Sequence, residues 1–531
     1  MTVRGAAAVG AGLSPAREAR LIREGERIHV VGAAGAGASA AALLAAWAGA
    51  RVDGCDPGGP SQYTPALGAA GIAVAAGHDP AHVRTSPPPD RLAVTKALTA
   101  IDPHNTELDA ARAAGVPLEA WQQVVADAAA GRMLVAVAGT HGKSTSSGWL
   151  VHVLAAGGAD PGAFVGALLP PSLTGIGCAA TARRGAGASF VVEADEYAGN
   201  FDAYRPDVIV LTSAEWDHPD VFADRPAVLR AFETWIRRAG PGAGDTGHRA
   251  GRAPVLVANV ADDGVAELAE RLSDWPGRIV ATALADVSPQ RLGGYARGIA
   301  DRFRTAAGPA QALLGRITGA DPDGTRIEIA GLDALSGALP VRLSTAGRHN
   351  ASNALGVAGA AAAVGLPAAA IMAGLASFAG VGRRLERKGE AAGVVVYDDY
   401  GHHPTAIRET LAAVRQREPG RRIWAVYEPL TYHRTAALLS SFADVLAAAD
   451  AVAIADIWAG RDPDTTIASA DGLARAVAAR APGIPCAAPG SVEATARWLA
   501  GEVRGGDAVL VMGGGRSYRI GELLLEHLRS R

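Results

Sequence analysis

Cysteine is scarce in this chain of 531 residues, and its three cysteines, Cys55, Cys178 and Cys486, are far apart. An odd number of cysteines at such distances forms no disulfide framework, and their spacing matches no metal-binding pattern. The first residues include a short Gly/Ala-rich apolar run, but arginines and glutamates follow it, which disfavours a signal peptide. We therefore expect a protein of a reducing compartment, the cytoplasm.

Long apolar runs and clusters of like charge are also missing. The sequence has no stretch of about eighteen strongly apolar residues, so we expect no membrane span. The formal charge is −3 and no Lys/Arg-rich run stands out, so nothing indicates a nucleic-acid partner. Hydrophobic residues make up 49% and charged residues 19%, as in a globular protein. The chain is too long for one core, and about two to four domains are expected.

Three segments combine a predicted strand, a glycine-containing turn and a predicted helix. The strands are expected at residues 28–31, 133–137 and 394–397, with helices beginning after Gly37, at Ser144 and at about Pro404. Such units open an α/β layer with a parallel sheet. Buried-strand runs follow each unit, and the last ends in glycines 513–515, where a ligand-facing loop is expected.

These units predict an α/β protein of three domains. We place a Rossmann-like domain at residues 1–131 and a central P-loop ATPase-like domain at residues 132–380. A C-terminal Rossmann-like domain is placed at residues 381–531. The predicted boundaries carry an error of several residues.

The stretch VAGTHGKSTS, residues 137–146, contains the parts of a phosphate-binding loop. The common pattern is G-x-x-x-x-G-K-[ST], and here Val137 stands where its first glycine belongs. A strand before the loop and a helix after it would point several N–H groups and a helix dipole at one place. The alternative is a glycine turn with a surface lysine. We predict ATP binding by Gly139, Thr140, His141, Gly142, Lys143, Ser144 and Thr145.

Acidic residues follow the next two predicted strands. VVEADEY places Glu193, Asp195 and Glu196 at a strand end, and LTSAEWDH ends in Glu215, Asp217 and His218. Ligands bind open α/β sheets at this edge, and carboxylates there often hold Mg²⁺ beside a nucleotide. The alternative for each is a solvated acidic turn. We interpret the pair of clusters as a site for metal or substrate.

Four further stretches carry candidate residues. In GAAGAG, residues 32–37, Ala34 replaces the second glycine of a dinucleotide fingerprint, which weakens an NAD interpretation but leaves phosphate binding open. GRHNASN contains Asn350 and Asn353, which could instead be helix caps. Paired arginines in GVGRRLE suit phosphate, or form a solvated face. In DDYGHHPT, two Asp and two His could form a transition-metal site, but the spacing matches no zinc pattern.

In order and content these motifs resemble the ATP-dependent Mur ligases, which build the peptide stem of peptidoglycan. The resemblance runs from about Ile28 to Gly515, and GTHGKST, EADEY, DH, GRHNASN, GVGRRLE and DDYGHHPT occur in family order. Within the family, GTHGK, HHP and the HRT of residues 433–435 are most similar to the branch that acts on L-alanine. A muropeptide ligase, which attaches L-Ala-γ-D-Glu-diaminopimelate to the same nucleotide sugar in cell-wall recycling, is the second candidate.

The resemblance implies a mechanism and a set of roles. The lactyl carboxylate of UDP-N-acetylmuramate attacks the γ-phosphate of ATP, and the amine of L-alanine displaces phosphate from the acyl phosphate. Lys143 and Mg²⁺ offset the charge that this step brings together. Catalytic roles are implied for Lys143, Glu193 and His218, with one Mg²⁺ on Ser144 and Glu193 and a second helped by His218. The remaining implied contacts are Asn350, Arg384 and Asp398 with ATP, His402 and Arg434 with the amino acid, and Gly32, Gly35, Gly37 and Ser39 with the UDP-sugar. The resemblance thus implies that the N-terminal domain binds the UDP-sugar and the central domain binds ATP. It implies that the C-terminal domain contacts the amino acid and closes over ATP.

Some residues depart from the family pattern. Ala34 and Ala38 replace a glycine and a methionine in the UDP loop. Thr431, in LTYHRT, stands where an arginine normally helps to bind the alanine carboxylate, so the amine specificity is open. A P-loop kinase or motor ATPase and a UDP-sugar binder without turnover are the other classes considered. The shortened loop argues against the first, and Lys143, Glu193 and His218 argue against the second. A monomer or homodimer is expected.

Overall fold

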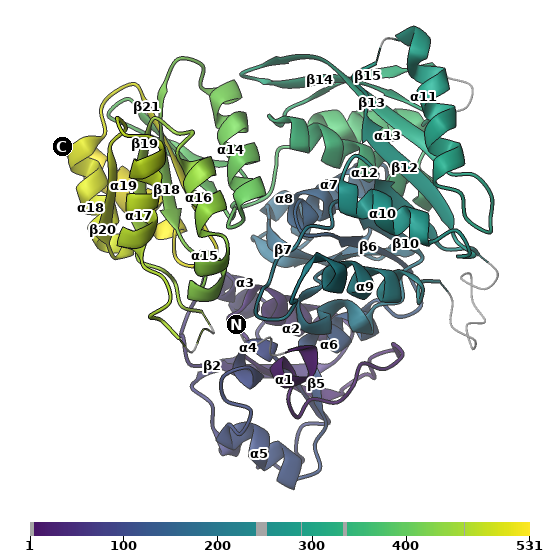
Figure 1. Cartoon of the computed structure of the whole chain (residues 1–531). Coiled ribbons are helices and arrows are strands. Elements are labelled where there is room, and N and C mark those ends of the chain that lie inside the picture. The colour runs from purple at the N-terminus through teal and green to yellow at the C-terminus, as the bar shows by residue number, and fades with distance from the viewer. Residues whose placement is uncertain are drawn as a thin grey trace.

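The computed structural model describes residues 5–240, 252–287, 289–332, 337–460, 462 and 464–530. Figure 1 shows three lobes, each built on its own sheet, with the N-terminal lobe in purple, the central lobe in blue to green and the C-terminal lobe in yellow-green. The predicted α/β class with parallel sheets is confirmed. The boundaries near residues 131 and 380 remain a proposal, and both fall between the last strand of one sheet and the first strand of the next.

The N-terminal lobe contains a five-stranded parallel sheet in the order β3-β2-β1-β4-β5. Small and apolar residues dominate α2, whose alanines pack closely on β1, so the helix covers one face of this sheet. The strands are β1 (Arg27–Val31), β2 (Arg51–Asp56), β3 (Val74–Ala76), β4 (Arg91–Val94) and β5 (Leu118–Ala120). The helices are α1 (Gly5–Val9), α2 (Ala36–Trp47), α3 (Thr64–Ala69), η1 (Pro80–His82), α4 (Lys96–Thr99), α5 (Thr106–Ala113) and α6 (Trp121–Ala128).

The central lobe contains a ten-stranded sheet in the order β15-β14-β13-β12-β11-β10-β6-β9-β7-β8. Strands β8, β14 and β15 pair antiparallel with their neighbours, and the pairs from β13 to β7 are parallel. The strands are β6 (Met133–Ala138), β7 (Gly162–Leu169), β8 (Ala180–Arg183), β9 (Ser189–Ala194), β10 (Val208–Leu211), β11 (Val255–Asn259), β12 (Arg278–Leu284), β13 (Gln311–Asp321), β14 (Gly324–Ala330) and β15 (Leu339–Leu343).

Side chains alternate along the buried strands of this sheet, so each strand supplies two cores. Val135 and Val137 of β6 face a core with α7, α12 and α13, whereas Leu134 and Ala136 belong to a core that continues into the N-terminal lobe. The helices of the central lobe are α7 (Lys143–Ala156), α8 (Pro171–Thr174), η2 (Tyr197–Ala203), α9 (Arg225–Ile236), α10 (Asp263–Arg271), α11 (Pro289–Arg302), α12 (Arg348–Val364) and α13 (Ala368–Ser377).

The C-terminal lobe contains a six-stranded sheet in the order β16-β17-β21-β18-β19-β20, parallel except for β16. Apolar residues of α14, α16 and α17 cover one face, and those of α18 and α19 cover the other. The strands are β16 (Glu386–Ala391), β17 (Val394–Asp399), β18 (Arg422–Glu428), β19 (Ala451–Ala455), β20 (Cys486–Gly490) and β21 (Asp507–Gly513). The helices are α14 (Pro404–Arg417), α15 (Tyr432–Ala437), α16 (Leu439–Leu446), α17 (Ala470–Arg480), α18 (Val492–Glu502) and α19 (Tyr518–Arg529).

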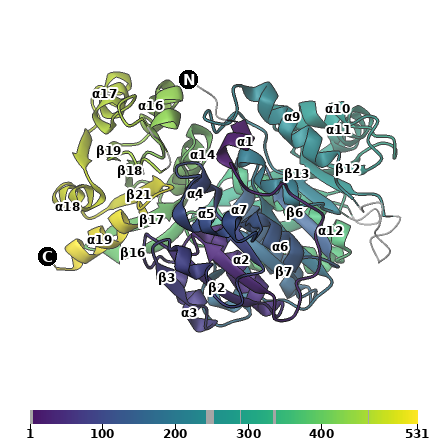
Figure 2. The same cartoon turned by 90° about the horizontal axis from the view of Figure 1, so that it is seen from below.

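The lobes contact one another directly. Helix α2 packs against β7 and β8 of the central sheet, and Thr181 donates to the carbonyl of Ala36 across 2.8 Å. Helix α14 lies beside the central lobe, where the side chain of Gln416 bonds the backbone of Gly347 and Gly324. Figure 2 shows the C-terminal helices α16 to α19 on one side, and Figure 1 shows the N-terminal helices α2 and α3 below the central lobe. Within the described part of the chain, none of the helices combines the length and apolar character needed to cross a bilayer.

Candidate active site

A cleft of about 670 Å³ lies where the three lobes meet. Its walls come from the loops after β1 and β2, the carboxyl ends of β6, β9 and β10, and the loops after β17 and β18. Ligands of open α/β sheets bind at these strand ends. Residues predicted as functional that line the cleft are Gly32, Thr140, His141, Gly142, Lys143, Ser144, Glu193, His218, Arg384, His402 and Arg434. Gly35, Gly37, Ser39, Gly139, Thr145, Asn350 and Asp398 are placed outside this lining.

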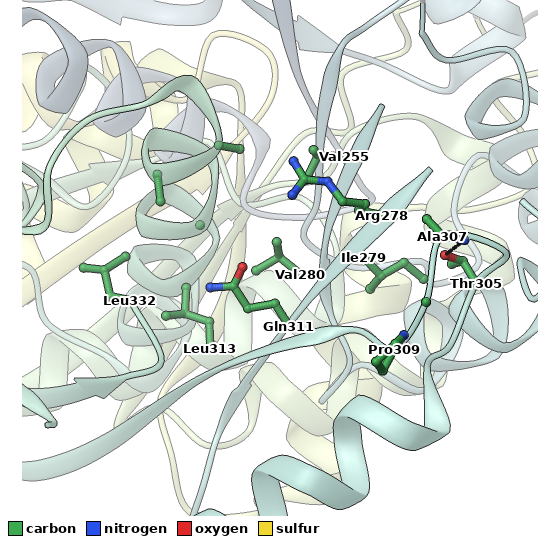
Figure 3. Close-up of a pocket in the computed structure, with 14 residues that line it drawn as sticks. Val255, Arg278, Ile279, Val280, Thr305, Ala307, Pro309, Gln311, Leu313 and Leu332 are labelled. Carbon is green, nitrogen blue, oxygen red and sulfur yellow. Dashed lines mark hydrogen bonds between the residues drawn. The ribbon is translucent and has the colours of Figure 1, made fainter. Parts of the chain in front are cut away.

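A second cavity, of about 410 Å³, lies between α12 and the strands β11 to β13 (Figure 3). Apolar side chains dominate its wall, with Arg278, Thr305 and Gln311 as the polar exceptions. Because no carboxylate, histidine or lysine is among its described lining residues, the chemistry belongs to the larger cleft.

The order of the central strands brings the sequence motifs together. Strand β6 lies between β10 and β9, so the ends of all three strands are adjacent. The GTHGKST loop follows β6, EADEY ends β9, and the loop with His218 follows β10. Stretches separated by about fifty to eighty residues therefore share one edge of one sheet, as expected for parallel strands.

The GTHGKST loop is held tightly against the neighbouring strand ends. Gly142 is the N-cap of α7 and has φ +79°, a conformation that favours glycine. A Cβ atom on Gly139 would lie 2.3 Å from Oγ1 of Thr212, so only glycine fits there. The backbone N–H of His141 donates to Oγ of Ser213 across 2.9 Å. The helix α7 begins at Lys143, one residue before the predicted start, and its N-terminus faces the cleft.

Lys143 points into an acidic environment. Its Nζ donates to the carbonyl of Gly139 at 2.6 Å and to Oε2 of Glu196 at 3.1 Å, with Asp195 at 3.7 Å. Burial disfavours the ammonium form, but the carboxylates of Glu196, Asp195 and Glu193 outweigh it and raise the pKa of Lys143. The side chain therefore carries a full positive charge at the centre of the cleft.

Ser144 and Glu193 form an oxygen-rich pair beside Lys143. Oγ of Ser144 donates to Oε1 of Glu193 across 2.9 Å, and the N–H of Gly166 holds Oε2 at 2.7 Å. A hydroxyl and a carboxylate are the donors that Mg²⁺ prefers, so this pair fits the predicted ion. His218 lies apart from the pair and beside Glu196, whose Oε1 is 4.0 Å from its Nε2. Asp195, Glu196 and His218 form a separate cluster of possible ligands.

Arg384 reaches from the C-terminal lobe to the loop. Its Nη2 donates to Oγ of Ser144 across 2.7 Å, and its guanidinium lies over the ring of Tyr400. Its buried Nε has no hydrogen-bond partner among the described residues, as expected of a group that binds an anion. The flanking residues Arg383 and Leu385 have φ of +57° and +50°, and such strain is typical of functional sites.

Arg383 and Asp398 form a buried pair away from the cleft lining. Nε of Arg383 lies 3.1 Å from Oδ2 of Asp398, and its Nη2 donates to the carbonyl of Gly513 and to Ser517. Burial raises the pKa of Asp398 to about 6. The adjacent arginines thus differ in their contacts. Arg384 lines the cleft, whereas Arg383 holds together the carboxyl ends of β17 and β21. The role of Asp398 in binding ATP remains a proposal.

Asn350 and Asn353 lie in the first turns of α12, whose N-cap is Gly347 rather than an asparagine. Asn350 is buried and donates to the carbonyl of Ala346 across 2.7 Å. Asn353 packs on Gly142, where an added Cβ would lie 2.7 Å from its Oδ1. The two residues are therefore beside the phosphate-binding loop, and the contact of Asn350 with ATP remains a proposal.

The loop after β1 has the close packing predicted for a nucleotide-binding turn. Gly32 has φ +83° and an added Cβ would lie 2.5 Å from Thr95, while a Cβ on Gly37 would lie 2.1 Å from Trp121. Ser39 is buried and donates to the carbonyl of Ala36. Asp56 ends β2 and accepts the N–H of Ala34 at 3.0 Å, in the cleft wall. Sequence reasoning missed Asp56, although an acidic residue at this strand end is a known ribose partner.

His402 and Arg434, the residues predicted to contact the amino acid, both line the cleft. Arg434 is buried and pairs with Asp217, 2.8 Å away, and its Nη2 lies 3.2 Å from Nδ1 of His218. Burial, and then the charge of Arg434, lower the pKa of His402 well below its usual range, so this side chain is neutral. Thr431 caps α15 with φ +65° and also lines the cleft.

Three loops meet around Glu215. Its Oε2 accepts from Thr405 of α14 at 2.8 Å and lies 3.5 Å from Nε2 of His141. The rings of His141 and His403 are 4.6 Å apart. These contacts join the phosphate-binding loop to the C-terminal lobe. His141, the histidine of the GTHGKST loop, therefore lies between the two lobes.

Comparisons with known proteins agree with this geometry. Residues 27–133 match the model of the Mur ligase family, catalytic domain, and residues 383–515 match that of Mur ligase, glutamate ligase domain. The chain is 37% identical over 510 residues to a UDP-N-acetylmuramate–L-alanine ligase of Kineococcus radiotolerans, covering 95% of this chain and 97% of the relative. The chain belongs to the Mur ligase family. This Mur ligase is 35% identical to the ligase of the same name from Mycolicibacterium vanbaalenii, covering 97% and 99% of the two chains.

Solved structures share the fold of this Mur ligase. A UDP-N-acetylmuramate–alanine ligase from Thermotoga maritima superposes with a TM-score of 0.71 at 21% identity, covering 95% of this chain and 99% of that one. A murein peptide ligase from Psychrobacter arcticus gives 0.67 at 24% identity, covering 96% and 99%. The predicted family and three-domain α/β class are confirmed, and the protein is an enzyme of the ligase class.

Proposed function

We propose that this Mur ligase joins L-alanine to the lactyl carboxylate of UDP-N-acetylmuramate at the expense of ATP, in peptidoglycan precursor synthesis. The observation that carries the proposal is the cleft itself. The phosphate-binding loop, the acidic end of β9 and the buried Arg434 all line it. Near full-length similarity to ligases of that name supports it.

ATP would bind with its outer phosphates at the N-terminus of α7. Backbone N–H groups of the loop, Lys143 and Arg384 converge there, and together they counter the charge of a triphosphate. Mg²⁺ would be held by Ser144 and Glu193, and when bound it neutralises phosphate charge. Arg384 is already within hydrogen-bond reach of Ser144, so the C-terminal lobe can hold the phosphates from the opposite side.

The sugar nucleotide would extend from the loop at Gly32 towards Lys143. The N-terminus of α2 would offer the first backbone N–H groups of the helix, and Asp56 would offer a carboxylate to hydroxyl groups. This orientation brings the lactyl carboxylate to the positively charged Lys143. Two anions could approach each other in the cleft because the cations Lys143 and Arg384 both line it.

The amine substrate would lie between His402 and Arg434. A neutral His402 can accept a proton from, or hydrogen-bond to, an ammonium group, and Arg434 offers a guanidinium to the α-carboxylate. The amine would then attack the acyl phosphate and displace inorganic phosphate. A cytoplasmic enzyme acting as a monomer or homodimer is part of the same proposal.

The test is phosphate release from ATP with each substrate omitted in turn. We expect release to require UDP-N-acetylmuramate and Mg²⁺ together with an amine, because the carboxylate must be activated before it is attacked. Release that continues without the sugar nucleotide would instead indicate a simple ATPase. Binding of the sugar nucleotide without any release would indicate a protein that has lost turnover.

A further inference from the structure

A compact cluster of metal-ligating side chains lies on the face of the N-terminal sheet that α5 and η1 cover. Strands β1 and β2 are parallel, with His29 opposite Asp53 and Val31 opposite Cys55. Since side chains alternate along a strand, His29, Asp53 and Cys55 all project from this one face. The face is opposite the one that Ile28 and Val30 present to α2.

Two further segments complete the cluster. His78 precedes η1 and His82 is its last residue, and α5 supplies Glu107. Nε2 of His29 is 2.9 Å from Oε1 of Glu107, which also lies 3.0 Å from Nδ1 of His82. Sγ of Cys55 is 3.4 Å from Nε2 of His29 and 3.2 Å from Oε2 of Glu107. Ligand atoms of His29, Cys55, His82 and Glu107 all lie within 4.8 Å of one another.

These separations suit a small tetrahedral site. With Zn–N near 2.0–2.1 Å and Zn–S near 2.3 Å, the edges of a zinc tetrahedron are roughly 3.3–3.6 Å long. Four of the contacts, at 2.9–3.4 Å, approach those edges, and all the ligand atoms lie within 4.8 Å of one another, so the side chains would draw together around an ion. One thiolate and one carboxylate balance the charge of a divalent ion, and sulfur with imidazole favours zinc over Mg²⁺.

Asp53 gives the cluster the outer contact that metal-bound histidines usually have. Its Oδ1 lies 2.7 Å from Nδ1 of His29, at the position where a carboxylate fixes the proton on that nitrogen. The lone pair of Nε2 is then directed at Cys55 and Glu107. His29, Cys55 and Glu107 are buried, at 2%, 0% and 0% exposure, which protects such a site from solvent.

We propose that His29, Cys55, His82 and Glu107 bind one Zn²⁺ ion, with Asp53 orienting His29. His78, whose Nδ1 is 3.2 Å from Sγ of Cys55, lies at the cleft side of the ion. Binding releases the thiol proton of Cys55 to solvent as the thiolate becomes a ligand. The ion is structural, because four protein ligands leave no open position for a substrate.

The proposed zinc site would connect the loop after β1 to the sheet face that α5 and η1 cover. The carbonyl of Cys55 accepts the N–H groups of Gly32 and Ala33, at 2.9 Å and 3.0 Å. A ligand bond at Sγ of Cys55 therefore fixes the residue on which the loop after β1 rests. The ion also joins η1 and α5 to β1 and β2, across a sheet face with only a small apolar core.

The experiment is cobalt substitution of the full-length enzyme, followed by absorption spectroscopy and by zinc analysis of the protein as purified. Saturating Mg²⁺ and ATP are present, so that the phosphate site does not take up the probe. We expect about one Co²⁺ per chain, with intense tetrahedral d–d bands and a near-ultraviolet thiolate-to-cobalt charge-transfer band, both removed by added Zn²⁺. Cys55→Ser should lose the charge-transfer band, and His82→Gln should weaken binding by about tenfold or more.

Matched controls are Cys178→Ser and Cys486→Ser, which remove the other free thiols, and His104→Ala, which removes an exposed imidazole. All three should keep the wild-type spectrum. The wild-type spectrum decides the matter even if a variant fails to fold. Absence of a thiolate charge-transfer band in wild-type protein, or a band that survives in Cys55→Ser, would overturn the proposal in favour of a purely hydrogen-bonded cluster.

Discussion

Nε of Arg434 donates to Oδ1 of Asp217 across 2.8 Å, and each of the two side chains is 4% exposed. The pair joins α15 of the C-terminal lobe to the loop that follows β10 of the central sheet. Burial disfavours the carboxylate, but Arg434 outweighs it and holds the pKa of Asp217 well below its usual range. A permanently charged guanidinium is thus fixed in the cleft wall, at the place proposed for the amine substrate.

Replacing Arg434 by Lys should mainly impair use of the amino acid. Lysine keeps the charge but not the planar fork that reaches Asp217 and His218 together. We expect the KM for L-alanine to rise about tenfold or more, with a smaller change in the KM for UDP-N-acetylmuramate, in steady-state assays. Arg480→Lys, at a surface pair with Asp444, is the control. An unchanged KM for L-alanine would remove Arg434 from the amine site.

Lys143→Ala should lower kcat by about 10²–10³-fold or more, because one buried cation that faces developing charge is lost. Phosphate release measures the effect, and circular dichroism checks the fold. Lys388→Ala is the matched control, since Lys388 is paired with Glu386 on β16 and lies outside the cleft lining. Near-normal turnover of Lys143→Ala would contradict the assignment of the loop.

Glu193→Gln should raise the Mg²⁺ concentration needed for half-maximal rate, by about tenfold or more. An amide keeps the hydrogen bond from Ser144 but removes the charge that favours the ion. A Mg²⁺ titration at saturating ATP measures this shift. Glu328→Gln, at an ion pair with Arg316 on the central sheet, should leave the titration unchanged. Equal Mg²⁺ dependence in the two variants would place the ion elsewhere.

Gly37→Ala should weaken sugar-nucleotide binding. The new Cβ would lie 2.1 Å from the indole of Trp121, so the start of α2 must move, at a cost of about 1–3 kcal/mol in unfolding free energy. We expect a higher KM for UDP-N-acetylmuramate with a near-normal KM for ATP. In Gly68→Ala the new methyl meets no atom within 4 Å among the described residues, so this control should behave as wild type. The same KM in both variants would show that the turn does not hold the sugar nucleotide.

His403 should make the protein less stable in mild acid. Burial, and then the charge of His141, lower the pKa of His403 to about 4, against about 6.5 in an unfolded chain. The unfolded state therefore binds more protons between these values, and the free energy of unfolding falls as the pH falls from about 6.5 to 4, by up to about 3 kcal/mol. Its Nδ1 also accepts the N–H of Thr405 at the start of α14, which requires the neutral ring.

His403→Asn keeps an N-cap acceptor and removes the titration. Chemical unfolding at pH 7 and pH 5 should therefore show a smaller loss of stability in this variant than in the wild type. His104→Asn changes an exposed histidine and should leave the loss unchanged. Parallel pH dependence of His403→Asn and wild type would show that another group governs acid stability.

Local patterns were enough to predict much of the fold and the phosphate-binding loop. Strands β1, β6 and β17 begin within a residue of the predicted positions, because apolar runs before glycine turns leave little choice of structure. Glu193 and His218 were found in the same way, since Glu193 lies at the end of the buried strand β9 and His218 in the loop after the buried strand β10. Parallel strands then bring such ends together whatever lies between them in the sequence.

Contacts between distant segments could not be predicted from the sequence. The distinct partners of Arg383 and Arg384 depend on the backbone turn between β16 and the central lobe, where the non-glycine residues Arg383 and Leu385 have positive φ. The ligands proposed for zinc come from β1, β2, η1 and α5, at spacings that no short motif covers. In the sequence, Cys55 is far from the other two cysteines and matches no metal-binding pattern. Only the register of β1 and β2 places it beside His29.

The central claim is that the enzyme joins L-alanine to UDP-N-acetylmuramate. The choice of amine tests it most directly, because Thr431 replaces the arginine that the resemblance leads us to expect beside the amino acid. The enzyme is given ATP, Mg²⁺ and UDP-N-acetylmuramate with equal concentrations of L-alanine, glycine, L-serine and L-Ala-γ-D-Glu-diaminopimelate, and the products are identified by mass spectrometry. We predict that UDP-N-acetylmuramoyl-L-alanine is the main product. A product that contains only the tripeptide would contradict the account and identify a muropeptide ligase.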